Sequence, residues 1–139
     1  MELGNADAMT QLGDMYMNGD GVKWNKKKAM QLFRAAAEND NAIAQAKLAI
    51  YLCEEGDLAG SVSFVTRSAE QGFTVAEHFL GRRIEDGEGV EVDLDEARRW
   101  YARAAAKGYE PSINALARLD REAREAESER VAADLLRDA

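Results

Sequence analysis

The sequence predicts an all-α fold built from tandem helix pairs, on three observations. Alanine fills 25 of the 139 positions, Pro111 is the only proline, and the helix formers Leu, Met, Glu, Lys, Gln and Arg are plentiful. A Leu-Gly or Leu-Ala dipeptide begins at Leu12, Leu48, Leu80 and Leu116, at spacings of 36, 32 and 36 residues. An alanine-rich segment recurs with the same period, as Ala36-Ala37-Glu38, Ser68-Ala69-Glu70 and Ala104-Ala105-Ala106. Such a period indicates a repeat architecture.

The second copy is four residues shorter than the other two, and the difference lies in a loop. The first and third copies carry Gly19-Asp20-Gly21-Val22 and Gly87-Glu88-Gly89-Val90, whereas the second carries Glu54-Glu55-Gly56-Asp57. Because a deletion confined to a loop leaves the helix registers intact, the alignment of the three copies is consistent.

The first helix of each pair carries apolar residues at spacings of three and four, which is typical of an amphipathic helix. Asn5 and Asn41 are predicted to cap the first two of these helices. Thr74, with Glu77 three residues later, has the spacing of a capping box at the start of the third.

The second helix of each pair is predicted to begin after the aligned residues Asn25, Asp57 and Asp93, which can accept hydrogen bonds from the first turn. Gly72 and Gly108 mark where the helices end, because glycine adopts the left-handed conformation easily. The first copy has aspartate at the aligned position, which predicts a strained or different turn there. The second copy contains a β-branched stretch, but its register still predicts a helix.

The small residues at fixed offsets predict close approach of neighbouring helices. Gly13 and Gly81 recur in the first helices, and Ala36, Ala37, Ala104 and Ala105 recur in the second. Aromatic side chains are expected to fill the space beside them.

These residues resemble the Sel1-like repeat, a relative of the tetratricopeptide repeat. The matching residues of the first copy are Leu12-Gly13, Tyr16, Gly19, Gly21-Val22, Lys28-Ala29 and Ala36-Ala37. The third copy matches at Leu80-Gly81, Gly87, Gly89-Val90, Asp93, Glu96-Ala97, Trp100-Tyr101, Ala104-Ala105 and Gly108. The resemblance implies a right-handed superhelix of antiparallel helix pairs whose members commonly act as adaptors and scaffolds. We expect one domain over residues 1–139, with repeats at about 5–40, 41–72 and 73–108 and a partial repeat or C-terminal capping helix at 109–139.

Both ends of the chain carry further signals. Gly4 lies one period before Asp40, which predicts that the chain begins at the last turn of an earlier repeat in a longer array. Pro111 suits the first turn of a helix, and no turn signal follows it, so roughly 27 residues could form one helix about 40 Å long. Its middle is rich in charges of both signs, which is typical of a solvated capping helix. Val131, Leu135 and Leu136 could dock back, pair with a second copy or fray.

Composition excludes several classes of function. Eighteen basic and 26 acidic residues give a net charge of −8, which disfavours nucleic acids and anionic membranes as partners. A chain with one cysteine cannot form an internal disulfide bond. One cysteine and one histidine are also too few for the usual ligand sets of a zinc site, so we expect no metal and no cofactor. No apolar run is long enough to span a membrane and no signal peptide opens the chain, which favours a soluble, cytoplasmic protein.

Catalytic patterns are also missing. The two Gly-x-Gly loops lack the third glycine of a dinucleotide fingerprint and are predicted to be turns. A cysteine-rich branch of the family that the chain resembles is associated with penicillin binding and β-lactam hydrolysis, but no serine here has a lysine three residues later. A pair of Cys53 and His78 is conceivable, but an inert thiol and a groove-lining imidazole are the favoured interpretation. We therefore expect no enzyme.

The resemblance implies a concave groove lined by the first helices of the pairs, and we predict that a protein or peptide binds there. An apolar centre with charged flanks suits an extended or helical peptide whose acidic group meets an arginine. Self-assembly, as a weak homo-oligomer through repeat ends or the C-terminal helix, is the alternative, and a hydrolase is a further one. The predicted binding residues are Thr10, Asp14, Met17, Ile43, Ala46, Ile50, Cys53, His78, Arg82, Glu85, Asn114 and Arg118.

Overall fold

The computed structural model describes residues 3–139, with side chains from Asn5 onward. Over this range the chain forms seven helices and no strand. The helices are α1 (Leu3–Asn18), α2 (Lys26–Glu38), α3 (Ala42–Glu54), α4 (Leu58–Glu70), α5 (Thr74–Asp86), α6 (Leu94–Ala106) and α7 (Glu110–Arg137). The prediction of an all-α fold is confirmed, including a helix for the β-branched stretch of the second copy.

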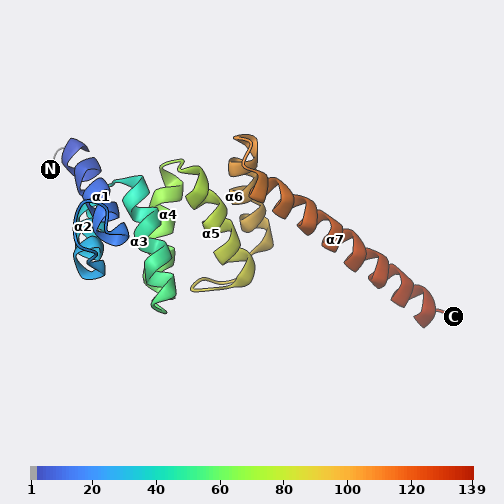
Figure 1. Cartoon of the computed structure of the whole chain (residues 1–139). Coiled ribbons are helices and arrows are strands. Elements are labelled where there is room, and N and C mark those ends of the chain that lie inside the picture. Colours follow the sequence, from blue (N-terminus) through green and yellow to red (C-terminus); the bar gives the residue numbers. More distant parts are fainter. Residues whose placement is uncertain (1–2) are drawn as a thin grey trace.

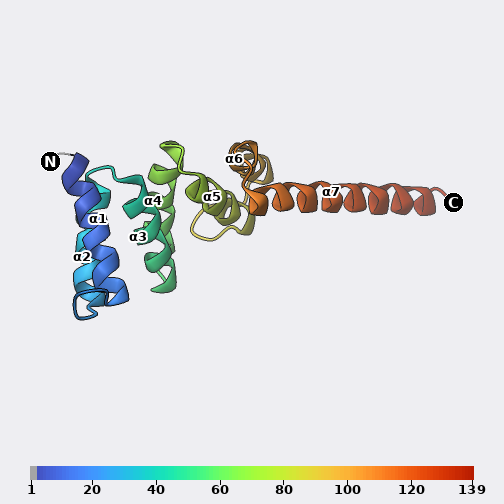
Figure 2. The ribbon, with the colours of Figure 1, turned by 45° about the horizontal axis from the view of Figure 1, so that its top comes forward.

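The helices form a row of antiparallel pairs, α1 with α2, α3 with α4, and α5 with α6 (Figure 1). Each helix packs mainly against the helices that precede and follow it in the chain, which is the arrangement of an α/α solenoid. In two views related by a rotation of 45°, α7 leaves the row and runs outward to the C-terminus (Figure 2). The side chains from Asp120 to Ala133 are exposed, as predicted for a solvated helix.

Four of the predicted helix caps are confirmed. Asn25, Asp57 and Asp93 accept hydrogen bonds from the backbone N–H groups of Lys28, Gly60 and Glu96, at 3.0, 2.9 and 3.0 Å. Asn41 caps α3 in the same way, with the N–H of Ala44 at 2.9 Å. These bonds span three residues, so the local sequence is enough to predict them.

Two predicted caps are wrong, and the helix end expected at Gly4 is not observed. Both Gly4 and Asn5 lie within α1, which begins at Leu3, so Asn5 caps no helix and Gly4 ends none. Phe73 is the N-cap of α5, without a side-chain hydrogen bond. Glu77 is instead buried and accepts a hydrogen bond at 2.9 Å from Lys107, which follows α6 in the same repeat, because a tertiary partner competes with the local cap.

The left-handed turns after the second helices are confirmed at Gly72 (φ 86°) and Gly108 (φ 83°). Asp40 adopts the same conformation, with φ 62°, rather than a differently shaped turn. Arg67 donates a hydrogen bond to the Asp40 carboxylate at 3.2 Å. This contact offsets part of the strain that a residue with a Cβ atom experiences at positive φ.

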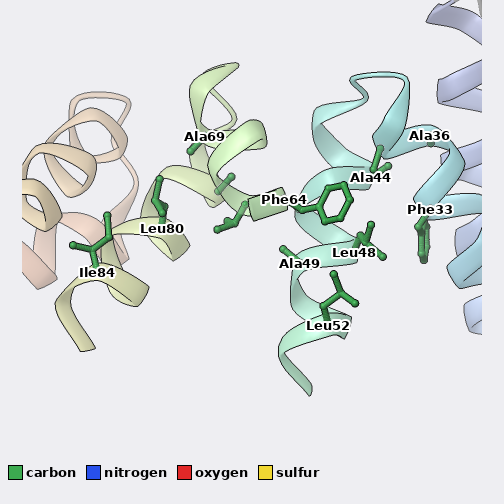
Figure 3. Packing of buried hydrophobic residues seen from close by; sticks show 14 of the residues in the cluster. Phe33, Ala36, Ala44, Leu48, Ala49, Leu52, Phe64, Ala69, Leu80 and Ile84 are labelled. Atoms are coloured by element: carbon green, nitrogen blue, oxygen red, sulfur yellow. The ribbon is translucent and has the colours of Figure 1, made fainter. Parts of the chain in front are cut away.

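The core follows the row of helices, from Phe33 through Leu48 to Ile84 (Figure 3). Two glycines determine how closely the paired helices approach. A Cβ atom on Gly13 would lie 2.7 Å from the Phe33 ring, and one on Gly81 would lie 2.9 Å from the Tyr101 ring. The second copy has Ala49 and Val65 at the aligned positions, so a larger residue on one helix is matched by a smaller one on the other.

This exchange predicts coupling between Gly81 and Tyr101. Gly81→Ala should destabilise the protein by about 1–2 kcal/mol, because overpacking outweighs the gain in helix propensity. Combining it with Tyr101→Val should cost less than the sum of the two single changes, by about 1 kcal/mol. Urea unfolding of the wild type, both single variants and the double variant measures the coupling. If the two losses of stability were strictly additive, the Tyr101 ring would not be the reason that position 81 requires glycine.

The loop before α6 packs back onto the preceding repeat. Gly89 has φ 78°, and a Cβ atom built on it would lie 2.7 Å from the carbonyl oxygen of Leu58, the first residue of α4. Val90 of the same loop packs against the core. The glycine-containing loop of the third copy is therefore a structural contact between repeats.

Candidate functional site

The predicted groove residues of the third and fourth copies converge on one hollow between α5, α6 and α7. The hollow has a volume of about 510 Å³. Its lining residues are His78, Arg82, Glu85 and Asp86 from α5, Tyr101 from α6, and Pro111, Asn114, Ala115 and Arg118 from α7. All five residues predicted from these two copies line it.

Glu85 lies at the centre of a hydrogen-bond network in this hollow. Its Oε1 atom accepts hydrogen bonds from the Tyr101 hydroxyl and from Arg118 Nη2, both at 2.7 Å. The Arg118 hydrogen bond holds the pKa of Glu85 below its usual value, and the Tyr101 hydrogen bond acts in the same direction. Burial, together with the hydrogen bond to Glu85, raises the pKa of Tyr101. The network thus keeps Glu85 ionised and fixes α7 against α5 and α6.

His78 joins α5 to the first turn of α7. Its Nδ1 atom shares a hydrogen bond of 2.8 Å with Oγ of Ser112, which is fully buried. The ring also packs against Tyr101 and Tyr109, with centroids 5.3 and 5.4 Å away. Burial lowers the pKa of His78, the nearby Arg82 lowers it further, and Glu85 opposes both.

This direction predicts a pH dependence of stability. The pKa of His78 is lower in the folded protein than in the unfolded chain, where it has its ordinary value of 6.5. As the pH falls below 6.5, the unfolded chain therefore takes up a proton before the folded protein does. The stability present above pH 6.5 is lost as the pH falls through the lower pKa of the folded state. The free energy of unfolding should therefore decrease on mild acidification, and His78→Gln should reduce this decrease. Urea unfolding at a series of pH values measures it. An unchanged pH profile in the variant would contradict the prediction.

Arg82 and Asn114 present accessible polar groups in the hollow. The Arg82 side chain is 62% exposed, and its ion pair with Asp86 is long, at 3.8 Å. Asn114 is exposed on the facing helix. These groups can bind an incoming carboxylate or peptide backbone without first breaking a short ion pair.

The predicted residues of the first copy do not form a comparable hollow. Thr10 is 5% exposed and its hydroxyl donates to the carbonyl of Ala6, so it is not available to a partner. Asp14 accepts a hydrogen bond from Lys47 at 2.5 Å. Met17 is half-buried and packs against the core. Placing Thr10 on a binding surface was therefore wrong.

The second copy contributes an apolar surface. Ile43 and Ile50 are 45% and 38% exposed, and half-buried Cys53 lines a small hollow with Ile50. Ala46 also borders this hollow but is only 4% exposed, so its side chain offers little contact area.

Sequence reasoning missed Tyr101 and Ser112, and the repeat alignment contained a signal for both. Tyr101 aligns with Phe33 and Val65, and its partner Glu85 aligns with Met17 and Cys53, so one copy replaces an apolar pair with a polar one. Ser112 likewise stands where earlier copies have Ala8, Ala44 and Ala76.

Among the described residues, the serine and cysteine nearest His78 are not placed for nucleophilic chemistry on a substrate. Cys53 and His78 line separate hollows, and Ser112, which does contact His78, is fully buried. In the described part of the chain, no three His, Cys, Asp or Glu side chains converge as a metal site. Over the same residues, no helix has the length and hydropathy needed to cross a membrane.

Comparison with known families decides the identity of the repeats. The model of the Sel1 repeat matches residues 6–41, 42–73 and 74–109. The chain belongs to the Sel1 repeat family. This confirms the resemblance drawn from the Leu-Gly dipeptides and glycine loops.

Two curated relatives are regulatory or localization factors by name. The chain is 28% identical over 118 residues to "Chitin synthase regulatory factor 3" of Schizosaccharomyces pombe, covering 76% of this chain and 12% of that protein. It is 39% identical over 67 residues to "Localization factor PodJL" of Caulobacter vibrioides, covering 48% of this chain and 7% of that protein. The chain thus spans only a small part of these relatives.

Solved structures of Sel1 repeat proteins share the fold. A Sel1 repeat protein from Oxalobacter formigenes superposes with a TM-score of 0.75 at 39% identity, covering 81% of this chain and 88% of that one. The antigen c5321 of uropathogenic Escherichia coli gives a TM-score of 0.76 at 35% identity, covering 81% of this chain and 25% of that one.

Proposed function

We propose that this chain is a non-enzymatic interaction scaffold that binds a peptide segment of a partner protein along the first helices of its repeats. The observation that carries the proposal is the convergence of His78, Arg82, Glu85, Asn114 and Arg118 on one open hollow. Sel1 repeat proteins commonly act as scaffolds, and the two curated relatives are named as regulatory and localization factors.

The chemistry of the surface favours a partner with an apolar residue and an acidic group. Ile43 and Ile50 supply exposed apolar area in the second copy. Arg82 supplies an accessible guanidinium one repeat later, which favours a carboxylate through charge-assisted hydrogen bonds. A partner segment that spans both copies would use both contacts.

The experiment is partner capture followed by affinity measurement. A pull-down with the 139-residue chain isolates the partner, and calorimetry then compares the wild type with Arg82→Glu and Ile50→Asp. Each change should weaken binding about tenfold or more while helical content stays unchanged. Arg99→Glu, at an exposed position on α6, is the matched charge control and should bind normally. Wild-type affinity in both groove variants would refute the groove as the binding site.

Self-assembly is the second candidate function, favoured by the apolar residues near the end of α7. Val131, Leu135 and Leu136 are exposed, so they do not dock back on the repeats. Their spacing could form a short apolar seam with a second copy. Sedimentation at increasing protein concentration tests this, because a scaffold segment should stay monomeric and a self-assembling one should gain mass.

A further inference from the structure

The short loop of the second copy leaves a place on the molecule uncovered. In the third copy, the loop before α6 reaches the backbone of Leu58 at the start of α4, through Gly89. By register, the position equivalent to Leu58 in the first copy is Lys26, at the start of α2. The second copy lacks the four loop residues that would reach it.

A hollow is present at that place. It has a volume of about 510 Å³ and lies between α2 and the C-terminal end of α3. Its lining residues are Lys26, Lys27, Met30, Gln31, Arg34, Leu52 and Glu55. None of them lines the hollow between α5 and α7. The deletion in the sequence and the hollow in the structure therefore coincide.

The hollow combines an apolar floor with a basic rim. Met30 packs against the core and Leu52 is buried, so they form the floor. Lys26, Lys27 and Arg34 face one acid, Glu55, whose ion pair with Lys26 is long at 3.8 Å. An excess of positive charge here contrasts with the net charge of −8 of the chain. Such a rim attracts acidic groups.

The third copy shows what kind of segment fills the equivalent place. Residues 87–93 read Gly-Glu-Gly-Val-Glu-Val-Asp, with three acidic residues and two valines. Gly89 makes the close approach to the preceding helix pair, and Val90 packs against the core. The chemistry of this loop is complementary to the basic rim and apolar floor between α2 and α3.

We propose that the hollow between α2 and α3 binds an acidic, glycine-containing segment of a partner protein, which occupies the place of the missing loop. Its carboxylates pair with Lys26, Lys27 and Arg34, and an apolar side chain covers Met30 and Leu52. This is a second interaction surface that is independent of the groove between α5 and α7.

A synthetic peptide with the sequence of residues 87–94 is the probe. Titrated into the isotope-labelled 139-residue chain, it should shift the backbone amide resonances of α2 and of the end of α3, and added salt should weaken the effect. A peptide with lysine in place of the three acidic residues should cause no such shifts. Shifts that are absent, or that lie elsewhere on the chain, would overturn the proposal.

Two variants make the test specific. Lys26→Glu with Lys27→Glu should weaken peptide binding about tenfold or more, whereas Arg121→Glu with Arg124→Glu on exposed α7 has the same net charge and should bind normally. In a graft, the six residues 87–92 replace Glu55 and Gly56, which restores the loop length. The graft should keep its helical content and no longer bind the peptide.

The other outcomes overturn the assignment. Equal weakening in both charge variants would mean that only the overall charge matters. Displacement of the peptide by a single-stranded oligonucleotide at the same concentration would indicate a general anion surface. The same resonance shifts on raising the protein concentration alone, together with a doubled mass, would make a second copy the occupant.

Discussion

Phe33→Ala is expected to lower the free energy of unfolding by about 3–5 kcal/mol. The Phe33 side chain is fully buried and contacts Gly13 of α1. Its ring stacks on that of Tyr51, with the two ring centroids 5.9 Å apart. It therefore fills the space where α1, α2 and α3 meet. Because Gly13 has no side chain with which to refill this space, the cavity should collapse poorly. Urea unfolding followed by circular dichroism measures the loss.

A repeat protein should show this loss unevenly along the chain. Each repeat is stabilised mainly by its neighbours, so the first helix pair should open before the rest. Hydrogen exchange should then report the largest loss of protection in α1 and α2. Leu136→Ala, at a residue that is 77% exposed, is the control and should change stability by no more than about 0.5 kcal/mol. Equal effects of the two substitutions would contradict the position of Phe33 in the core.

The helix pairs could be predicted from the sequence because their determinants are local. Asn25, Asp57 and Asp93 cap helices whose first turns follow them directly, and their hydrogen bonds depend on a spacing of three residues. Errors arise where a tertiary contact between helices competes with a local signal. Glu77 is the clearest case, because pairing with Lys107 removes it from the capping role that its sequence position indicates.

The candidate site was harder to predict, because residues at the same aligned position of different repeats have different surroundings. Thr10, Ala46, His78 and Asn114 are aligned, yet the first two are buried, His78 is half-buried and Asn114 is exposed. Thr10, Ala46 and His78 lie on α1, α3 and α5, each of which is followed by further helices of the row. Asn114 lies on α7, after which the described chain has no further helix to cover it. Register alone therefore could not predict that Thr10 and Ala46 are buried whereas Asn114 is exposed.

Gly89→Ala is expected to destabilise the protein by about 2–4 kcal/mol, although it adds a single methyl group at an exposed residue. Two costs combine. A residue with a Cβ atom is strained at φ 78°, and this Cβ would lie 2.7 Å from the carbonyl oxygen of Leu58 and 2.9 Å from its carbonyl carbon. Backbone atoms at the start of α4 cannot move aside as a flexible side chain can, so the loop must detach or the repeats must separate. Urea unfolding gives the total cost.

Gly108→Ala separates these two costs. Gly108 has φ 83°, but no atom lies within 4 Å of the Cβ that would be added. It should therefore lose only the conformational part, about 1 kcal/mol. The difference between the two variants measures how strongly the loop of the third copy holds two repeats together. Equal losses would mean that the loop does not press on α4, and that the four residues absent from the second copy leave no vacant place against α2.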